Sequence, residues 1–242
     1  MKAVILAAGI ASRLRPLTNN TPKCLLKVGS KSILELTIDN ILSNNISEII
    51  IVTGYLQDQI RNFVSGKYPS LKVEYIYNDV YDSTNNIYSL WLVKENVLGD
   101  DMLMMDSDII FDQQIISKLL SSGYKNCLAL KRHDVGEEEI KVKTDKTGRV
   151  LEISKEVKPK EALGESIGIE LFGKESLGKL FEIIEHKVKV EKEVNRFYEA
   201  AFQELIQNGE DIFVVDTTEH MCMEIDTAAD LEIAGKLILK NV

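Results

Sequence analysis

A loop near the start of the chain carries residues suited to binding phosphate. It spans residues 7–23 and follows an apolar run, residues 3–6, that predicts a buried strand. Gly9 allows the backbone to turn and approach a ligand, and exposed amides in such a turn suit the oxygens of a polyphosphate. Arg13 and Lys23 add two cations, one able to bind phosphate bidentately and one a mobile point charge. We therefore predict a phosphate-binding loop.

Acidic residues suited to a metal ion occur far along the chain. Asp106 and Asp108 flank one serine at the end of a predicted strand, and Asp226 lies near the C-terminus. Alternate residues of a strand face the same way, so Asp106 and Asp108 can meet one hard cation. Taken alone, an Asp-x-Asp pattern is more often a loop with a helix-capping aspartate. With the cationic loop, however, these residues suit phosphoryl-group transfer, which needs positive charge and alignment rather than a nucleophilic side chain.

The elements that position these residues alternate between strand and helix in the first half. We predict strands over residues 3–6, 48–53, 73–77, 102–105 and 127–131, and helices over residues 33–42, 57–64, 87–97 and 113–120. Such alternation favours parallel βαβ units with right-handed crossovers. Ligands of such sheets lie beyond the carboxyl ends of the strands, which is where the loop and the Asp-x-Asp pattern occur.

The second half of the chain has a different pattern. We predict a hairpin of residues 140–143 and 150–153, strands over 165–172 and 212–215, and helices over 175–185, 196–207 and 227–239, with Thr227 as a cap. The charge run 187–193 predicts a solvated connection. The predicted fold is therefore α/β: a mostly parallel Rossmann-like sheet flanked by helices, with a smaller antiparallel acceptor-side subdomain. We predict one domain, 1–242, with a nucleotide-binding half of about 1–132 and an acceptor-side half of about 133–242 that returns Asp226 to the site.

Composition limits the class of protein. The chain has 242 residues, a net charge of −9 and no apolar run as long as a membrane span, which argues against nucleic-acid or membrane partners. Its three cysteines form neither a disulfide framework nor a metal-binding pattern, so we read them as buried small hydrophobes and expect a reducing cytoplasm. The three histidines lie in no catalytic pattern and are read as ordinary surface or structural residues.

Two motifs resemble those of a known family. Residues 7–23 resemble the signature AAG-x-G-x-R-L-x-P-L-T-x-x-x-P-K of the nucleotidylyltransferases that make nucleotide-diphospho compounds, although Ala11 stands where the family usually has a second glycine. Residues 224–231 resemble the E-I-D-T-x-x-D-L motif of the same enzymes. The resemblance implies that Asp108 and Asp226 hold Mg²⁺ beside the α-phosphate. It assigns the predicted catalytic and nucleotide-binding roles to Lys23 and Arg13, and to Leu6, Ala7, Ala8, Gly9, Ser12, Gly54, Tyr55, Asn86, Ser89 and Asp106.

Further motifs narrow the resemblance to cytidylyltransferases. Residues 85–92 are similar to the N-N-x-Y-S-L-x-L stretch of bacterial choline-phosphate and 2-aminoethylphosphonate cytidylyltransferases, which also often carry a segment like residues 195–202. This implies that Asn86 and Ser89 contact the cytosine edge or the ribose. On the acceptor side the same resemblance points to Lys155 for phosphate. Carboxylates and an aromatic face suit a cationic amine or quaternary ammonium, and the candidate acceptor-binding residues are Lys155, Glu165, Glu170, Tyr198 and Glu199.

The prediction is thus a Mg²⁺-dependent cytidylyltransferase that uses CTP and a small phospho- or phosphono-acceptor. A sugar-1-phosphate nucleotidylyltransferase using UTP or dTTP is a close alternative, although the glutamine-proline-x-glycine segment usual in that branch is absent. An Asp-x-Asp glycosyltransferase is a second alternative, but such an enzyme does not need a loop that binds the intact triphosphate of a nucleotide. A nucleotide-binding regulator is a third, and the combination of a metal pair with two cations argues against it. The sequence leaves the acceptor and a homo-oligomeric state open.

Overall fold

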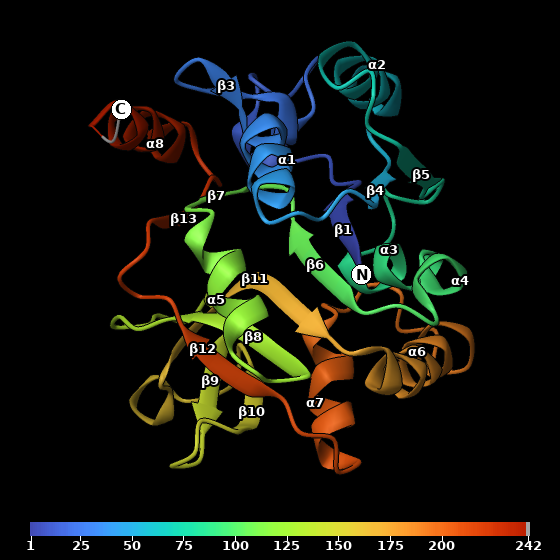
Figure 1. Cartoon of the computed structure of the whole chain (residues 1–242), viewed down its shortest axis with the longest axis vertical. Coiled ribbons are helices and arrows are strands. Elements are labelled where there is room, and N and C mark those ends of the chain that lie inside the picture. Colours follow the sequence, from blue (N-terminus) through green and yellow to red (C-terminus); the bar gives the residue numbers. More distant parts are fainter. Residues whose placement is uncertain (241–242) are drawn as a thin grey trace.

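The apolar strands of the first half form a parallel sheet in a computed structural model that describes residues 1–240 (Figure 1). The first strand pairs with two neighbours, and the strand over residues 73–77 extends the sheet at its edge. In spatial order these strands are β5, Val73–Tyr77; β4, Ile49–Thr53; β1, Lys2–Ala7; and β6, Met102–Asp106. Because the four strands are parallel, the loops that follow them gather at one edge of the sheet.

The second half continues the same sheet in the antiparallel sense. The long strand β11, Gly164–Phe172, pairs antiparallel with β6, with β8 and, at its start, with β9. The remaining strands are β8, Asn126–Lys131; β9, Lys141–Thr144; β10, Val150–Ser154; and β12, Phe213–Asp216, which runs parallel to β8. The predicted α/β class and the hairpin of β9 and β10 are therefore confirmed, and one nine-stranded sheet runs through both halves.

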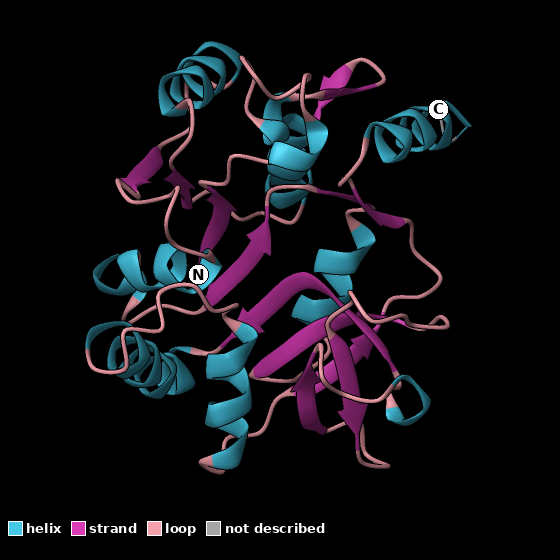
Figure 2. Ribbon diagram, turned by 180° about the vertical axis from the view of Figure 1, so that it is seen from behind, coloured by secondary structure: helices cyan, strands magenta, loops and turns pink. Residues whose placement is uncertain are grey.

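Helices cover both faces of this sheet and form two apolar cores. On one face lie α1, Ile33–Ser43; α2, Gln57–Lys67; and α5, Gln114–Ser121. On the other lie α3, Asn86–Leu92; α4, Lys94–Val97; α6, Lys174–Lys189; and α7, Glu199–Gln207 (Figure 2). Alternate side chains of β1 serve the two cores, Ile5 facing α1 and Leu6 facing α3.

A small peripheral layer brings the C-terminal segment to the sheet. It contains β2, Lys27–Val28; β3, Lys31–Ser32; β7, Ile109–Phe111; β13, Cys222–Glu224; and α8, Ala228–Lys240, with short 3₁₀ turns at Ser12–Leu14, Lys23–Leu25 and Pro159–Glu161. The antiparallel pairing of β7 with β13 carries the chain after residue 221 back to the end of β6. Thr227 caps α8 as predicted: the Asp230 amide donates to its Oγ1 (3.2 Å).

Three predicted segments need correction. The helix predicted over 87–97 breaks at Val93 into α3 and α4, and the helix predicted over 196–207 begins only at Glu199. The charge run 187–193 is not a solvated connection at its start, because Lys187 is buried at the end of α6 and its Nζ lies 2.7 Å from the Glu204 carboxylate. Within residues 1–240, none of the helices has the length and apolarity needed to span a bilayer.

Candidate active site

The loop 7–23 forms one wall of a cleft beyond the ends of β1 and β6. Its turn places Ala11 in the left-handed region, with φ 52°, at the position where the resembling family usually has glycine. The loop is braced from behind: Thr18 Oγ1 donates to the Ala11 carbonyl (2.9 Å), and Tyr55 OH donates to the carbonyls of Thr18 (3.1 Å) and Asn19 (2.7 Å). At Gly54 a Cβ would lie 2.6 Å from the Ala8 carbonyl oxygen, so glycine permits this close approach.

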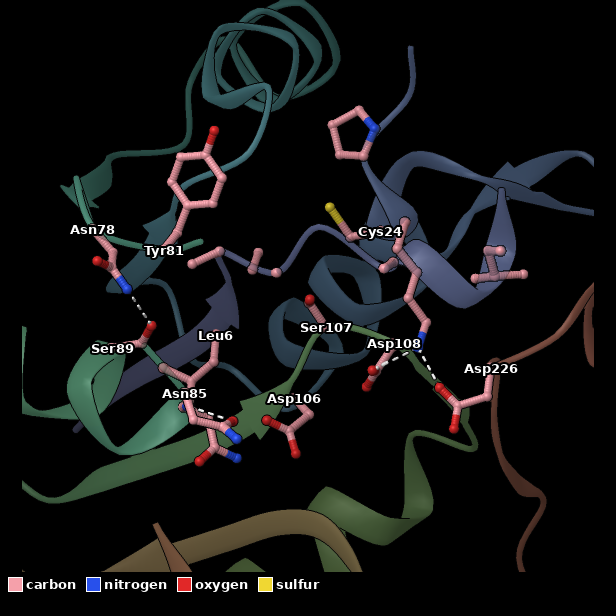
Figure 3. Close-up of a pocket in the computed structure, with 18 of the residues that line it drawn as sticks. Leu6, Cys24, Asn78, Tyr81, Asn85, Ser89, Asp106, Ser107, Asp108 and Asp226 are labelled. Carbon is pink, nitrogen blue, oxygen red and sulfur yellow. Dashed lines mark hydrogen bonds and ion pairs between the residues drawn. The ribbon is translucent and has the colours of Figure 1, made fainter. Parts of the chain in front are cut away.

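Two cations of this loop meet two distant carboxylates at the centre of the cleft. Lys23 Nζ lies 2.8 Å from Asp108 Oδ2 and 2.9 Å from Asp226 Oδ1, the two ion pairs drawn as dashed lines to these aspartates in Figure 3. Arg13 lies 2.8 Å from Asp226 Oδ2. The pairing of β7 with β13 makes this possible, since the Ile225 amide donates to the Asp108 carbonyl (2.9 Å). Residues separated by more than 200 positions along the chain thus form one charged centre.

A third carboxylate, which the sequence analysis did not assign to the metal, completes this centre. Oxygens of Asp108, Glu224 and Asp226, hereafter the outer cluster, all lie within 4.8 Å of one another. Glu224 and Asp226 are two residues apart in an extended segment, and this spacing was the signal that could have found Glu224. Three carboxylates are the donor set that Mg²⁺ accepts, so the residues present fit the predicted ion. Asp106 is not part of the cluster.

Mutual repulsion and pairing set the protonation of the outer cluster. Burial opposes the charge of Lys23, but the adjacent Asp108 and Asp226 outweigh it and raise the pKa of Lys23. Burial likewise works against ionised Asp226, yet Lys23 and Arg13 lower the pKa of Asp226. Burial together with the charges of Asp108 and Asp226 raises the pKa of Glu224 to about 8. This pKa keeps Glu224 largely protonated near pH 7, so Lys23 and Arg13 balance the charges of Asp108 and Asp226, and a bound cation would displace the Glu224 proton.

The opposite end of the same cleft carries short polar side chains at the start of α3 (Figure 3). Asn78 Nδ2 donates to Ser89 Oγ (3.2 Å), so the Ser89 hydroxyl hydrogen remains available to a ligand. The Tyr198 amide donates to Asn86 Oδ1 (2.9 Å), which leaves the Asn86 Nδ2 group available as a donor. Two hydrogen-bond donors can thus face a planar ligand held at this end of the cleft.

A second cleft adjoins the first and has a volume of about 670 Å³, against about 320 Å³ for the first. It lies between the hairpin of β9 and β10, the start of β11 and the residue that opens α7. The two clefts share a wall made of Arg13, Asn86, Asp106, Asp108, Phe197, Glu224 and Asp226. Two ligands placed in the two clefts would therefore meet at the charged centre.

A second group of carboxylates lies at the inner side of this wall. Asp106, Glu170 and Glu199, hereafter the inner cluster, influence one another electrostatically, and Tyr198 OH donates to Asp106 Oδ2 (3.0 Å). Burial, then the charges of Asp108 and Glu199, raises the pKa of Asp106 well above its usual value. Burial, then the charges of Asp106 and Glu199, does the same to the pKa of Glu170. Burial raises the pKa of Glu199 to about 7.

The structure places the predicted residues in three groups. The nucleotide-side residues that line the first cleft are Leu6, Ala7, Ala8, Gly9, Arg13, Lys23, Asn86, Ser89, Asp106, Asp108 and Asp226. Lys155, Glu165 and Glu199 line the second cleft. Ser12, Gly54 and Tyr55 lie outside the linings, the latter two behind the loop.

Glu170 and Tyr198 also depart from the predicted acceptor lining, because both are fully buried behind the wall. Residues five apart in a strand face opposite sides, so Glu165 reaches the cleft while Glu170 enters the core under α7.

Cationic side chains near the second cleft are engaged with neighbours. His133, read from the sequence as an ordinary residue, lines this cleft, and its Nε2 lies 2.8 Å from Glu165 Oε2. Lys155 Nζ lies 3.1 Å from Glu138 Oε2 and 5.1 Å from the centre of the Phe197 ring. All three cysteines are buried, as predicted.

Comparisons with known proteins agree with this geometry. The sequence pattern of the family described as Nucleotidyl transferase matches residues 2–219. A choline-phosphate cytidylyltransferase of Streptococcus pneumoniae is 40% identical over 124 residues, which cover 51% of this chain and 52% of that protein. A CTP:phosphoglutamine cytidylyltransferase of Campylobacter jejuni is 28% identical and covers 96% of this chain and 98% of its own. The solved structure of the CTP:phosphocholine cytidylyltransferase from Streptococcus pneumoniae superposes with a TM-score of 0.81 at 27% identity, covering 98% of both chains.

Proposed function

Because the chain belongs to the nucleotidyl transferase family, we propose that it transfers CMP from CTP to a small phosphorylated or phosphonate acceptor and releases pyrophosphate. The observation that carries this proposal is the charged centre shared by two adjoining clefts, which we assign to the nucleotide and the acceptor. Relatives that act on CTP support the choice of cytidylyl transfer. We also propose that residues about 1–132 bind the nucleotide and about 133–242 supply the acceptor side of a single domain.

The chemistry requires two anions to react. An oxygen of the acceptor phosphate or phosphonate forms a bond to the α-phosphorus of CTP, and the bond from that phosphorus to the bridging oxygen breaks as pyrophosphate leaves. Lys23 faces the α-phosphate and neutralises charge that develops there, while Arg13, which is largely exposed, follows the departing pyrophosphate. A Mg²⁺ ion held by Asp108, Glu224 and Asp226 would supply further positive charge and alignment.

Selection of the base rests on the donors at the start of α3. Cytosine offers two neighbouring acceptors, its ring N3 and its O2, which match the free donors of Asn86 and Ser89. Uracil and thymine carry a hydrogen on N3, so one donor would face another. An unpaired buried group costs about 1–3 kcal/mol. We therefore expect CTP to be used at least about tenfold more efficiently than UTP or dTTP.

The test is a panel of nucleoside triphosphates with phosphocholine, 2-aminoethylphosphonate and sugar 1-phosphates, with pyrophosphate release as the readout. Ser89→Ala and Asn86→Ala are expected to reduce the preference for CTP over UTP more than they reduce turnover with CTP. Asp79→Asn, an exposed substitution outside both clefts, serves as the control. Equal use of UTP, or a preference for dTTP with a sugar 1-phosphate, would assign the chain to the sugar-nucleotide branch instead.

A further inference from the structure

Glu199 is a buried acid in the wall of the second cleft with one unsatisfied carboxylate oxygen. It opens α7 and is 6% exposed, and its Oε2 has no hydrogen-bond partner among the described residues. Within residues 1–240, no Lys, Arg or His nitrogen forms an ion pair within 4.0 Å of the Glu199 carboxylate oxygens. A buried carboxylate oxygen left unpaired is costly, and proteins rarely keep one unless a ligand or ion completes it.

The surroundings of Glu199 show which charge is missing. Asp106 and Glu170 bring two further buried carboxyl groups from β6 and β11, and the charge of Glu199 helps to raise the pKa of both. The cation that lowers the pKa of Glu199 is Lys155, but its ammonium is paired with Glu138 and lies over the Phe197 ring. This end of the cleft therefore holds three carboxyl groups and, among the described residues, no cation within ion-pair distance of Glu199. A positively charged ligand group is the natural complement.

Resting on the proposed function, we infer that the acceptor carries a primary ammonium group and that the Glu199 carboxylate binds it through N–H donors. The second cleft reaches from the outer cluster to Glu199, so one small molecule can place its phosphate or phosphonate at the charged centre and its amine at Glu199. An unpartnered oxygen needs a hydrogen-bond donor, and a primary ammonium supplies three. Glu199 is thus a specificity-determining residue.

A quaternary ammonium fits this cleft less well. Trimethylammonium groups carry no N–H and are held by several aromatic faces. Of the described residues that line the second cleft, Phe197 is the only phenylalanine, tyrosine or tryptophan. Its ring already lies under the Lys155 ammonium, at 5.1 Å from the ring centre. Tyr198, the neighbouring aromatic residue, is fully buried and uses its hydroxyl on Asp106.

The experiment compares acceptors and one isosteric variant with CTP fixed. We expect 2-aminoethylphosphonate or phosphoethanolamine to be used at least about tenfold more efficiently, in kcat/KM, than phosphocholine, the value of one charged hydrogen bond. Glu199→Gln keeps the shape and removes the charge, and it is expected to raise the KM for the amino acceptor roughly tenfold or more while the KM for CTP stays within about twofold. Glu95→Gln, an exposed substitution far from both clefts, is the matched control.

Each outcome is decisive and separates this inference from the proposed function. Turnover of CTP with phosphocholine equal to or above that of the amino acceptors overturns the inference but leaves cytidylyl transfer intact. An amino-acceptor KM in Glu199→Gln equal to that of the wild type also overturns it. The absence of turnover with every acceptor tested would contradict the proposed function. In that case calorimetric titration of 2-aminoethylphosphonate into the wild type and Glu199→Gln still tests the inference, and equal affinity would reject it.

Discussion

The outer cluster lies on the wall that the two clefts share and the inner cluster lies at its inner side, and the charges of the two clusters are balanced in opposite ways. The outer cluster is partly exposed, and two of its members pair directly with Lys23 and Arg13. The inner cluster is more deeply buried, and its members have no cation within ion-pair distance in the described residues. Its charge is reduced by burial, which raises the pKa of each member.

This difference indicates what each cluster can exchange. In the outer cluster a bound metal ion and phosphates would replace cation–carboxylate pairs by other cation–anion pairs, so little charge is left uncompensated during the exchange. The inner cluster has no paired cation to release, so a cationic ligand group would displace protons from its carboxyl groups. Under the proposed function, the outer cluster and its cations would bind phosphate and the inner cluster would contact the acceptor.

The largest expected effect breaks the outer cluster. Asp226→Asn removes a partner of both cations and a candidate metal ligand at once. We expect turnover to fall by roughly a thousandfold or more, with loss of Mg²⁺-dependent activity, because charge and alignment at the phosphates supply most of the rate enhancement. Asp108→Asn is expected to act in the same way. Pyrophosphate release as a function of Mg²⁺ concentration measures both.

The control for these variants is Asp79→Asn, which changes an exposed carboxylate outside the clefts. Circular dichroism would verify that each variant is folded. If Asp226→Asn kept more than about a tenth of the turnover with an unchanged Mg²⁺ requirement, Asp226 would not be a ligand.

A smaller effect is expected when a cation is removed and the carboxylates are kept. Lys23→Ala takes away the group that bridges Asp108 and Asp226. Turnover should fall roughly a hundredfold, the scale of one preorganised charged contact, while the Mg²⁺ concentration for half-maximal activity does not rise. The second readout distinguishes this variant from Asp226→Asn. Exposed Lys72→Ala is the control, and near-normal turnover of folded Lys23→Ala would remove Lys23 from the mechanism.

Besides its expected effect on the acceptor KM, the inner cluster is expected to make the stability of the protein depend on pH. The pKa of Glu199 is raised to about 7 in the folded state, against about 4.5 unfolded. The folded protein therefore holds a proton that the unfolded chain has lost between these values, and stability falls as pH rises through this window. The charge of Lys155 favours ionisation of Glu199, but burial outweighs it.

Between pH 5.5 and 8 the Glu199 contribution amounts to about 2 kcal/mol. Glu199→Gln has no titrating group at this position. Between pH 5.5 and 8, the free energy of unfolding of Glu199→Gln should therefore fall less than that of the wild type, by about 2 kcal/mol. Urea unfolding at the two pH values measures the difference, with Glu95→Gln as the reference. Parallel pH profiles for wild type and Glu199→Gln would show that Glu199 titrates normally.

Local patterns predicted much of this molecule. The loop 7–23 and the strand end at Asp106 were predicted from the sequence. In an α/β sheet, an apolar run followed by small or acidic residues is typical of a buried strand and the ligand-binding loop that follows it. The family motifs then linked Asp108 to Asp226. In the structure the link is physical, through the pairing of β7 with β13.

The parts that were missed depend on long-range packing. β7 and β13 have three residues each, too few for hydrophobic periodicity to predict their pairing. This pairing brings Glu224 next to Asp108 and Asp226 in the outer cluster. Glu170 was predicted at the cleft because its neighbours in sequence include Glu165, although the alternation of β11 turns it into the core. Lys187 was predicted as solvated because nothing local reveals its contact with Glu204 on α7.

The left-handed turn at Ala11 limits which residues evolution can place there. A residue with a Cβ is disfavoured in this conformation by about 1–2 kcal/mol, so alanine is tolerated at a modest cost and glycine would remove it. Asparagine and aspartate also visit this region, whereas valine, isoleucine and proline do not fit it. Position 11 therefore disfavours β-branched residues and proline, although Leu56 and Lys192 take this conformation elsewhere in the chain, and glycine is the substitution that the backbone accepts most readily.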